Sequence, residues 1–250
     1  MKRNFYGIRV DDLSEQEALS KFSDFFSTDQ AHSLFFINTH CYNVASENSA
    51  YKNALDKCNL LFNDGVGLEF GAKLSGYKFK ENMNGTDLIP KIIHLAHEKK
   101  QKIFLLGATP GTTDIVVNKL STIYDSDLIA DHRNGYFTDE EESLVVEQIN
   151  NSKASILIVG MGVPRQELFV TRNLDKLNNI KLAIAGGAIL DFLAGSVRRA
   201  PKFMIKLKLE WFFRFLQEPK RLFRRYFFGN FKFIFSLLKY KFKNKKNDQQ

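Results

Sequence analysis

Three polar side chains in the first third of the chain could act on a substrate: Asn38, His40 and Asp64. Asp64 follows the apolar run 59–63 and precedes two closely spaced glycines. We therefore expect its carboxylate at the edge of a sheet, where partial burial would suit it to act as a general base. An Asp in front of a helix is also a common N-cap. The residues alone leave both interpretations open.

His40 lies just past another apolar run, 33–38. A histidine can exchange a proton or bind a ligand near neutral pH. A lone histidine also serves as a structural hydrogen-bonding residue, and both roles stay open. Asn38 points to the same side and could bind a sugar hydroxyl or cap the end of the strand.

The segment 160–167 (GMGVPRQE) has the pattern of a strand–turn–helix junction. Its backbone N–H groups and the helix N-terminus could hold a diphosphate. It is not the dinucleotide fingerprint GxGxxG, because Arg165 stands at the third glycine, and no GxxxxGK[ST] phosphate loop occurs in the chain. The chain also lacks an HExxH motif, and we expect neither a metal site nor a cofactor.

Short apolar runs alternate with helical patterns between about residues 32 and 195 and must position these side chains. This order predicts an α/β fold, a Rossmann-like, doubly wound, mainly parallel sheet with helices on both faces. The polar segments then meet at the carboxyl edge of the sheet. We expect strands at 33–38, 59–63, 102–106, 155–159 and 182–185, and helices at 42–55, 86–99, 112–124, 164–177, 202–216 and 221–242.

The last part of the chain, 196–250, differs in composition from the body, 1–195. It holds 16 Lys and Arg residues against 3 Asp and Glu, a net charge of +13, and 14 of the 33 aromatic residues. Such a segment indicates a polyanionic partner, namely a membrane surface, a lipid phosphate or a nucleic acid. A solvated basic face is the alternative. The many aromatic residues favour packing on the body or entry into a membrane interface.

The overall composition excludes several classes of protein. With 250 residues, 44% of them hydrophobic and 26% charged, the chain can fold around a substantial core. Two cysteines, Cys41 and Cys58, are too few for a disulfide scaffold, and we expect both to be reduced, as in a cytosolic protein. We find no signal peptide at the start and no apolar run of about 18 residues that could span a membrane.

Nine short stretches resemble the WecB/TagA/CpsF family of bacterial glycosyltransferases. They occur in the family's order and cover roughly residues 5–230. Each is weakly specific alone, but together they are highly specific. The stretches are 38–43 (NTHCYN), 63–67 (NDGVG), 84–88 (NGTDL), 104–111 (FLLGATPG), 135–137 (GYF), 160–167 (GMGVPRQE), 186–195 (GGAILDFLAG), 199–201 (RAP) and 210–225 (EWFFRFLQEPKRLFRR).

This resemblance implies a glycosyltransferase body, 1–195, and a helical, membrane-associating appendage, 196–250. It also implies inverting, metal-independent transfer of a sugar from a UDP-sugar to an undecaprenyl-diphosphate-linked saccharide in polysaccharide or teichoic acid assembly. N-acetylmannosamine is the expected sugar, and a glucose or uronic acid donor is the alternative. The enzyme would be cytoplasmic and peripherally associated with the inner face of the cell membrane.

Carried over residue by residue, the resemblance gives Asp64 the role of candidate catalytic base, with His40 and Asn38 beside it. Two positions depart from the family pattern: 38–40 reads Asn-Thr-His where teichoic-acid-type members often have Thr-x-Asn, and Asn82 stands where many members carry arginine. The matching binding positions are Gln166 in the substrate pocket, Tyr136, Gly187 and Asp191 at the nucleotide, and Arg214, Arg221 and Arg224 at the lipid diphosphate.

Two other classes of function compete with this one. A nucleotide- or RNA-binding module would use the basic aromatic tail to stack bases. The tail lacks a known RNA motif and the body is acidic, so we expect no nucleic acid partner. A catalytically silent scaffold in a polysaccharide assembly complex is the third hypothesis. The sequence leaves a homo-oligomer open.

Overall fold

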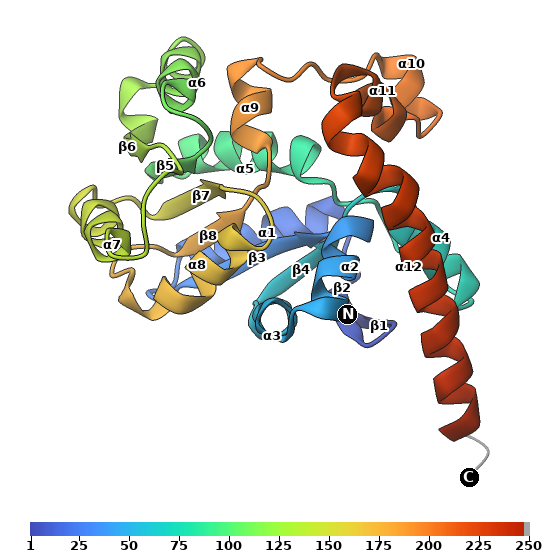
Figure 1. Ribbon diagram of the computed structural model, residues 1–250. Helices are drawn as coiled ribbons and strands as arrows, with labels where there is room; N and C mark the ends of the chain where they lie inside the picture. The colour runs from blue at the N-terminus through green and yellow to red at the C-terminus, as the bar shows by residue number, and fades with distance from the viewer. Residues whose placement is uncertain (248–250) are drawn as a thin grey trace.

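A six-stranded parallel sheet forms the centre of the molecule (Figure 1). The structure is a computed structural model that describes residues 1–247, with side chains up to Phe242. The strand order is β4-β3-β8-β7-β5-β6, and all neighbours are parallel. The α/β fold is therefore as predicted. The strands are β3 (His32–Ile37), β4 (Leu60–Asn63), β5 (Ile103–Gly107), β6 (Ile129–Arg133), β7 (Ile156–Gly160) and β8 (Leu182–Ala185).

Helices cover both faces of this sheet (Figure 1). Successive strand residues point to opposite faces, so Leu105 enters one apolar core while Phe104 and Leu106 enter the other. Both cores consist of buried apolar side chains, which explains why the strands read as continuous apolar runs. One face carries α2 (Thr39–Glu47), α3 (Ser49–Lys57), α7 (Glu142–Asn151) and α8 (Arg165–Asn173), and the other α1 (Glu15–Phe26), α5 (Gly85–Glu98), α6 (Thr112–Ser121) and α9 (Ile189–Ala194).

Three strands are present that the apolar runs do not reveal. β6 contains Asp131, His132 and Arg133, all half-buried, and pairs only with β5 at the edge of the sheet. An edge strand that is partly exposed to solvent need not consist of a continuous run of apolar residues. The other two, β1 (Lys2–Phe5) and β2 (Ile8–Asp11), form a separate antiparallel hairpin.

The prediction of one helix over 42–55 is wrong, because Asn48 interrupts it. Asn48 has an extended backbone with ψ of 102°, and its side chain accepts a hydrogen bond from the Tyr51 N–H. It thereby ends α2 and caps α3. α2 also begins earlier than predicted, because the Asn38 side chain accepts hydrogen bonds from the N–H groups of His40 and Cys41.

The single helix predicted over 202–216 is likewise wrong. Lys208 adopts a left-handed backbone with φ of 60°, which an α-helix cannot contain. It separates α10 (Lys202–Lys206) from α11 (Glu210–Gln217).

A long C-terminal helix, α12 (Pro219–Asn247), runs along the side of the body (Figure 1). Pro219 begins this helix. Leu222, Phe233 and Leu237 are buried on its inner side, and the Asn43 side chain of α2 donates a hydrogen bond to the Gly229 carbonyl at 2.7 Å. Within residues 1–247, none of the helices has the length and apolar character needed to cross a bilayer.

Candidate active site

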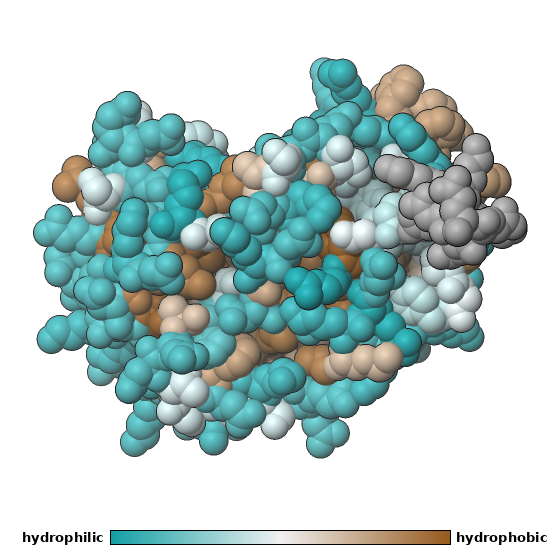
Figure 2. Space-filling model, turned by 90° about the horizontal axis from the view of Figure 1, so that it is seen from below, coloured by the Kyte–Doolittle hydropathy of each residue, from teal (hydrophilic) through white to brown (hydrophobic). Residues whose placement is uncertain are grey.

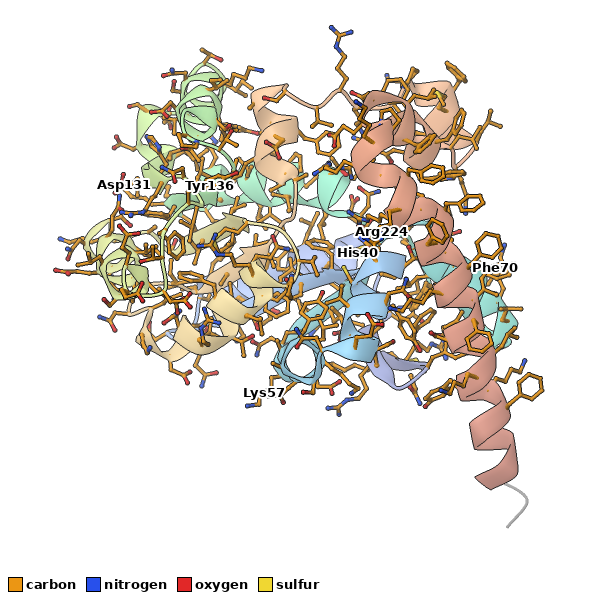
Figure 3. The ribbon with its side chains drawn as sticks, viewed as in Figure 1. His40, Lys57, Phe70, Asp131, Tyr136 and Arg224 are labelled. Carbon is orange, nitrogen blue, oxygen red and sulfur yellow. The ribbon has the colours of Figure 1, made fainter. Side chains whose placement is uncertain are left out.

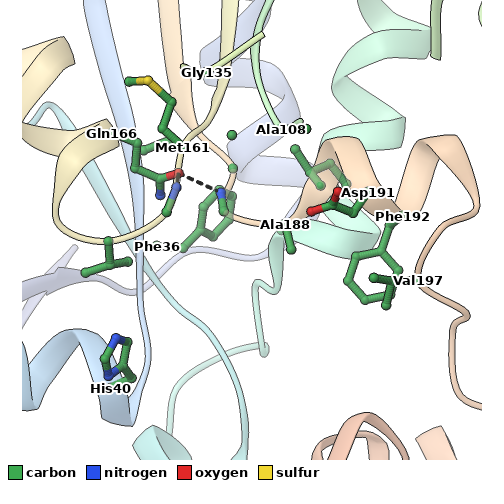
Figure 4. Close-up of a pocket in the computed structure, with 18 of the residues that line it drawn as sticks. Phe36, His40, Ala108, Gly135, Met161, Gln166, Ala188, Asp191, Phe192 and Val197 are labelled. Atoms are coloured by element: carbon green, nitrogen blue, oxygen red, sulfur yellow. Dashed lines mark hydrogen bonds between the residues drawn. The ribbon is translucent and has the colours of Figure 1, made fainter. Parts of the chain in front are cut away.

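A cavity of about 750 Å³ lies at the carboxyl ends of the parallel strands. Each of the six strands sends its following loop to the wall, as parallel topology requires. Figure 4 shows His40, Gln166 and Asp191 projecting from three different elements around the same open space. The C-terminal helices close one side of the cavity, with Arg214, Glu218, Arg221 and Arg225 in its lining.

Asp64 lines the cavity immediately after β4 (Leu60–Asn63). Its backbone N–H donates to the Ile37 carbonyl at 2.8 Å, and its Oδ2 lies 3.4 Å from the Asn38 Nδ2 donor. The next helix, α4 (Val66–Leu74), is capped by Gly65 without any side-chain hydrogen bond. The alternative interpretation of Asp64 as a helix N-cap is therefore wrong, and its carboxylate is left facing the cavity.

The turn that carries Asp64 is held by its neighbours. Gly65 has φ of 88°, in the region that favours glycine, and its N–H donates to the Asn82 side chain at 2.8 Å. A Cβ at Gly67 would lie 2.1 Å from Cγ2 of Thr39, so only glycine lets α4 approach the start of α2 this closely. Asn82, the departure from the family's arginine, thus holds the turn beside Asp64.

The surroundings of Asp64 raise the pKa of its carboxyl above the ordinary value of 3.8. Burial is the main cause, and the Asn38 hydrogen bond and the charges of Arg214 and Arg225 only partly oppose it. A raised pKa brings a carboxylate closer to the basicity that proton abstraction at neutral pH requires. The role of Asp64 as a general base remains a prediction, which its position in the cavity and its raised pKa support.

His40 lies in the first turn of α2, where it lines the cavity half-buried. Burial, together with the charges of Arg225 and Lys232, lowers the pKa of His40 to about 4. The imidazole is therefore uncharged at neutral pH and offers one donor and one acceptor. Its position fits a contact with substrate and equally a structural role.

Gln166 joins two of the glycine-rich loops. Its Oε1 accepts hydrogen bonds from the N–H of Gly162, after β7, at 3.2 Å and of Gly187, after β8, at 3.0 Å. Sequence reasoning missed the next residue, Glu167, which is fully buried at the cavity wall and accepts from the Gln166 amide at 2.9 Å. No pattern in the sequence sets Glu167 apart, because α8 begins Arg165-Gln166-Glu167 and an acidic residue is common in the first turn of a helix.

Tyr136, in the loop after β6, and Asp191, in α9 after β8, both line the cavity. Tyr136 is 66% exposed, and its loop is held by Arg165, which donates to the carbonyls of Gly135 and Phe137 at 2.9 and 2.6 Å. Arg165, at the place of the missing third glycine, therefore supports this loop. Burial raises the pKa of Asp191, with Arg221 opposing.

Of the appendage arginines, Arg214 and Arg221 line the cavity, whereas Arg224 is exposed and is not part of the lining. Arg225 lines it instead, half-buried and with no partner for its Nε atom within the described part of the chain. The helical period explains the difference, because Arg225 follows the buried Leu222 by three residues and so shares its face. The role of Arg224 remains a prediction.

Ion pairs fasten the appendage to the body near the cavity. Arg199 pairs with Asp87 at the start of α5 and lies 3.7 Å from Glu210 at the start of α11. Lys208 pairs with Glu69 of α4. The motifs NGTDL and RAP thereby meet, and α11 with Arg214 is held over the cavity.

The outer side of α12 carries an aromatic stripe, which we call the aromatic ridge: Phe223, Phe227, Phe231 and Phe235. These residues repeat every four positions and are between 50% and 69% exposed. Phe70 of α4, 48% exposed, also points outward (Figure 3). The face seen from below is mainly hydrophilic, with apolar side chains in small groups (Figure 2). Of the tail aromatics, Phe233 thus packs on the body and the ridge does not, and entry of the ridge into a membrane interface remains a prediction.

An Asp-x-Asp pair, Asp125 and Asp127, lies at the short turn Ser126–Leu128 and not in the cavity lining. In the part of the chain that the structure describes, no group of three or more His, Cys, Asp and Glu side chains is arranged to hold a metal ion.

Comparisons with known proteins agree on one family. The model of the glycosyl transferase WecG/TagA/CpsF family matches residues 3–247. An N-acetylglucosaminyldiphosphoundecaprenol N-acetyl-beta-D-mannosaminyltransferase of Bacillus subtilis is 32% identical over 185 residues, 74% of this chain and 71% of the relative. A protein of the same name from Staphylococcus aureus is 28% identical over 223 residues, 88% of this chain and 87% of the relative.

Proposed function

Because the chain belongs to the glycosyl transferase WecG/TagA/CpsF family, we propose that this glycosyltransferase moves an N-acetylmannosamine-type sugar from a UDP-sugar to an acceptor saccharide on undecaprenyl diphosphate. The names of the relatives from Bacillus subtilis and Staphylococcus aureus support both the sugar and the acceptor. The product would serve the assembly of teichoic acid or another surface polysaccharide.

The proposed chemistry is a single inverting displacement. An acceptor hydroxyl oxygen attacks the anomeric carbon of the donor sugar from the side opposite UDP. Asp64 takes the hydroxyl proton while the bond from the anomeric carbon to the UDP oxygen breaks, and UDP leaves with the electron pair. The cavity position of Asp64 and its raised pKa support this role.

One observation carries the proposal: the cavity holds a candidate base and free guanidinium groups together. Arg214 and Arg225 both line it and both act on the pKa of Asp64. No ion pair engages either arginine within residues 1–242, so both can meet an anion. Guanidinium groups match the geometry of phosphate oxygens. A diphosphate would thus be bound beside the base.

The binding residues carried over from the family have consistent positions. Gly187, Gln166 and Asp191 lie together in the lining, and Tyr136 stands at the rim, where we assign the nucleotide of the donor. Arg221, which also pairs with Glu218, lies on the side of the appendage, where we assign the diphosphate of the lipid.

The appendage would bring the enzyme to the inner face of the cell membrane. The aromatic ridge can enter the interface, and Lys and Arg near an anionic leaflet each contribute about 1 kcal/mol. Binding of this kind is peripheral and reversible. The lipid diphosphate would then enter the cavity from the side of α11 and α12.

A donor screen tests the proposal. Purified protein is mixed with UDP-N-acetylmannosamine, UDP-glucose or a UDP-uronic acid and with synthetic polyprenyl-diphosphate-N-acetylglucosamine, and products are read by mass spectrometry. We expect the mass of a single added N-acetylhexosamine, formed equally in EDTA, and NMR of the product should show an anomeric configuration inverted relative to the donor. Transfer of glucose or a uronic acid would assign a different donor, and no transfer at all would favour a silent scaffold.

A further inference from the structure

Glu167 is a buried acid that the displacement does not use. It lies in the first turn of α8, is 0% exposed and contributes to the wall of the cavity. Its Oε1 accepts a hydrogen bond from the Gln166 amide, whereas its Oε2 has no partner within the described residues. A buried carboxyl with one unsatisfied oxygen is costly to keep. The presence of such a group therefore needs a functional explanation.

The hydrogen bonds around Gln166 show what the carboxyl can control. The oxygen of the Gln166 amide accepts hydrogen bonds from the N–H groups of Gly162 and Gly187, and its nitrogen donates a hydrogen bond to Glu167. The loops after β7 and β8, the two strands at the middle of the sheet, are therefore tied by one side chain. An acceptor at Glu167 fixes this orientation, because a flipped amide would set oxygen against oxygen there.

We propose that Glu167 is a positioning residue for the donor site: its carboxyl holds the Gln166 amide, which in turn holds the Gly162 and Gly187 loops in the geometry that binds the nucleotide. The inference rests on the proposed function, since it assumes that a nucleotide diphosphate occupies these loops. Glu167 itself would touch no substrate, because its free oxygen is buried and not accessible from the cavity.

The ionisation of Glu167 adds a way to observe this role. Burial raises the pKa of Glu167 to about 7, although the hydrogen bond from Gln166 opposes this effect. The carboxyl therefore changes charge in the neutral range, and the charged form is the stronger acceptor. Cys41 and Tyr51 are buried nearby, and Glu167 contributes to raising the pKa of both.

The first test compares Glu167→Leu, which removes the acceptor, with Glu167→Gln, which keeps a carbonyl oxygen. UDP is the probe in calorimetry, and hydrogen exchange is measured on the protein without UDP. In Glu167→Leu we expect about tenfold weaker UDP binding, the size of one lost charge-assisted hydrogen bond, and faster exchange at the Gly162 and Gly187 amides. Glu167→Gln should recover most of both losses. Glu142→Gln is the matched control, because Glu142 of α7 accepts hydrogen bonds from Arg172 and Asn173 at the opposite end of α8.

A merely structural role would speed exchange throughout the strands and leave UDP affinity unchanged. Unaltered affinity and loop exchange in folded Glu167→Leu would overturn the proposal. If Glu167→Leu does not fold, the pH dependence decides. Between about pH 6 and pH 8, UDP binding should tighten more in the wild type than in Glu167→Gln, and equal pH dependences would refute the positioning role. Exchange needs no catalysis, so it remains informative if the transferase assay finds no activity.

Discussion

Replacing Glu167 by Gln should make the stability of the protein less dependent on pH. The folded carboxyl has a pKa of about 7 against an ordinary value of 4.5, because it is buried. At about 1.4 kcal/mol per pKa unit, this difference corresponds to about 3 kcal/mol. The folded state binds the proton more tightly than the unfolded chain, so the stabilisation is complete below about pH 4.5 and is lost as pH rises through 7. Glutamine does not titrate.

The assay is urea unfolding of the wild type and Glu167→Gln between about pH 4.5 and pH 8, followed by fluorescence. The free energy of unfolding of the variant should rise relative to that of the wild type by about 3 kcal/mol across this range. Glu142→Gln is the control that should show no trend across this range: burial opposes ionisation there, but hydrogen bonds from Arg172 and Asn173 outweigh it and lower the pKa of Glu142, so its pH-dependent contribution lies below about pH 4.5. Parallel curves for the wild type and Glu167→Gln would refute the reasoning.

Three further predictions concern the cavity and the appendage. His40→Gln should lower turnover without lowering the unfolding midpoint if His40 contacts substrate; unchanged kinetics and unfolding midpoint would leave only a structural role. Arg225→Gln should raise KM for the lipid acceptor about tenfold, the size of one lost phosphate contact. Arg224→Gln should raise KM less, because Arg224 does not line the cavity. The reverse order in steady-state assays would contradict the cavity geometry. Phe227→Ser with Phe231→Ser should weaken flotation with anionic liposomes; full flotation would exclude the aromatic ridge as the membrane contact.

The sequence predicts the sheet well because five of its six strands are buried on both faces and therefore read as apolar runs. The same argument cannot find β6, whose Asp131 and His132 face partial solvent. Helix breaks are also hidden. Asn48 and Lys208 are ordinary residues for a helix pattern, and only tertiary packing shows that one caps the next helix and the other turns left-handed.

In the candidate site, too, some features could be predicted from the sequence and others depend on tertiary packing. Asp64, Asn38 and His40 could be placed together because parallel strands bring their carboxyl ends to one edge. Arg224 comes from the family resemblance alone, whereas the rotation of α12, which turns Arg225 into the cavity, could not be predicted from the sequence because Pro219 hides the phase of the helix. The hydrogen bonds of Gln166 could not be predicted either, because they depend on how the loops after β7 and β8 meet around its side chain.

The central claim is that Asp64 removes the acceptor proton, and Asp64→Asn tests it most directly. Turnover is measured with UDP-N-acetylmannosamine and the synthetic lipid acceptor, and UDP affinity is measured by calorimetry in the same preparation. The substitution keeps the shape of the side chain and the contact with Asn38 but removes the base. We predict that turnover falls by about 10²–10⁴-fold while UDP affinity stays within about twofold. Turnover near that of the wild type would contradict the assignment of Asp64 as the base.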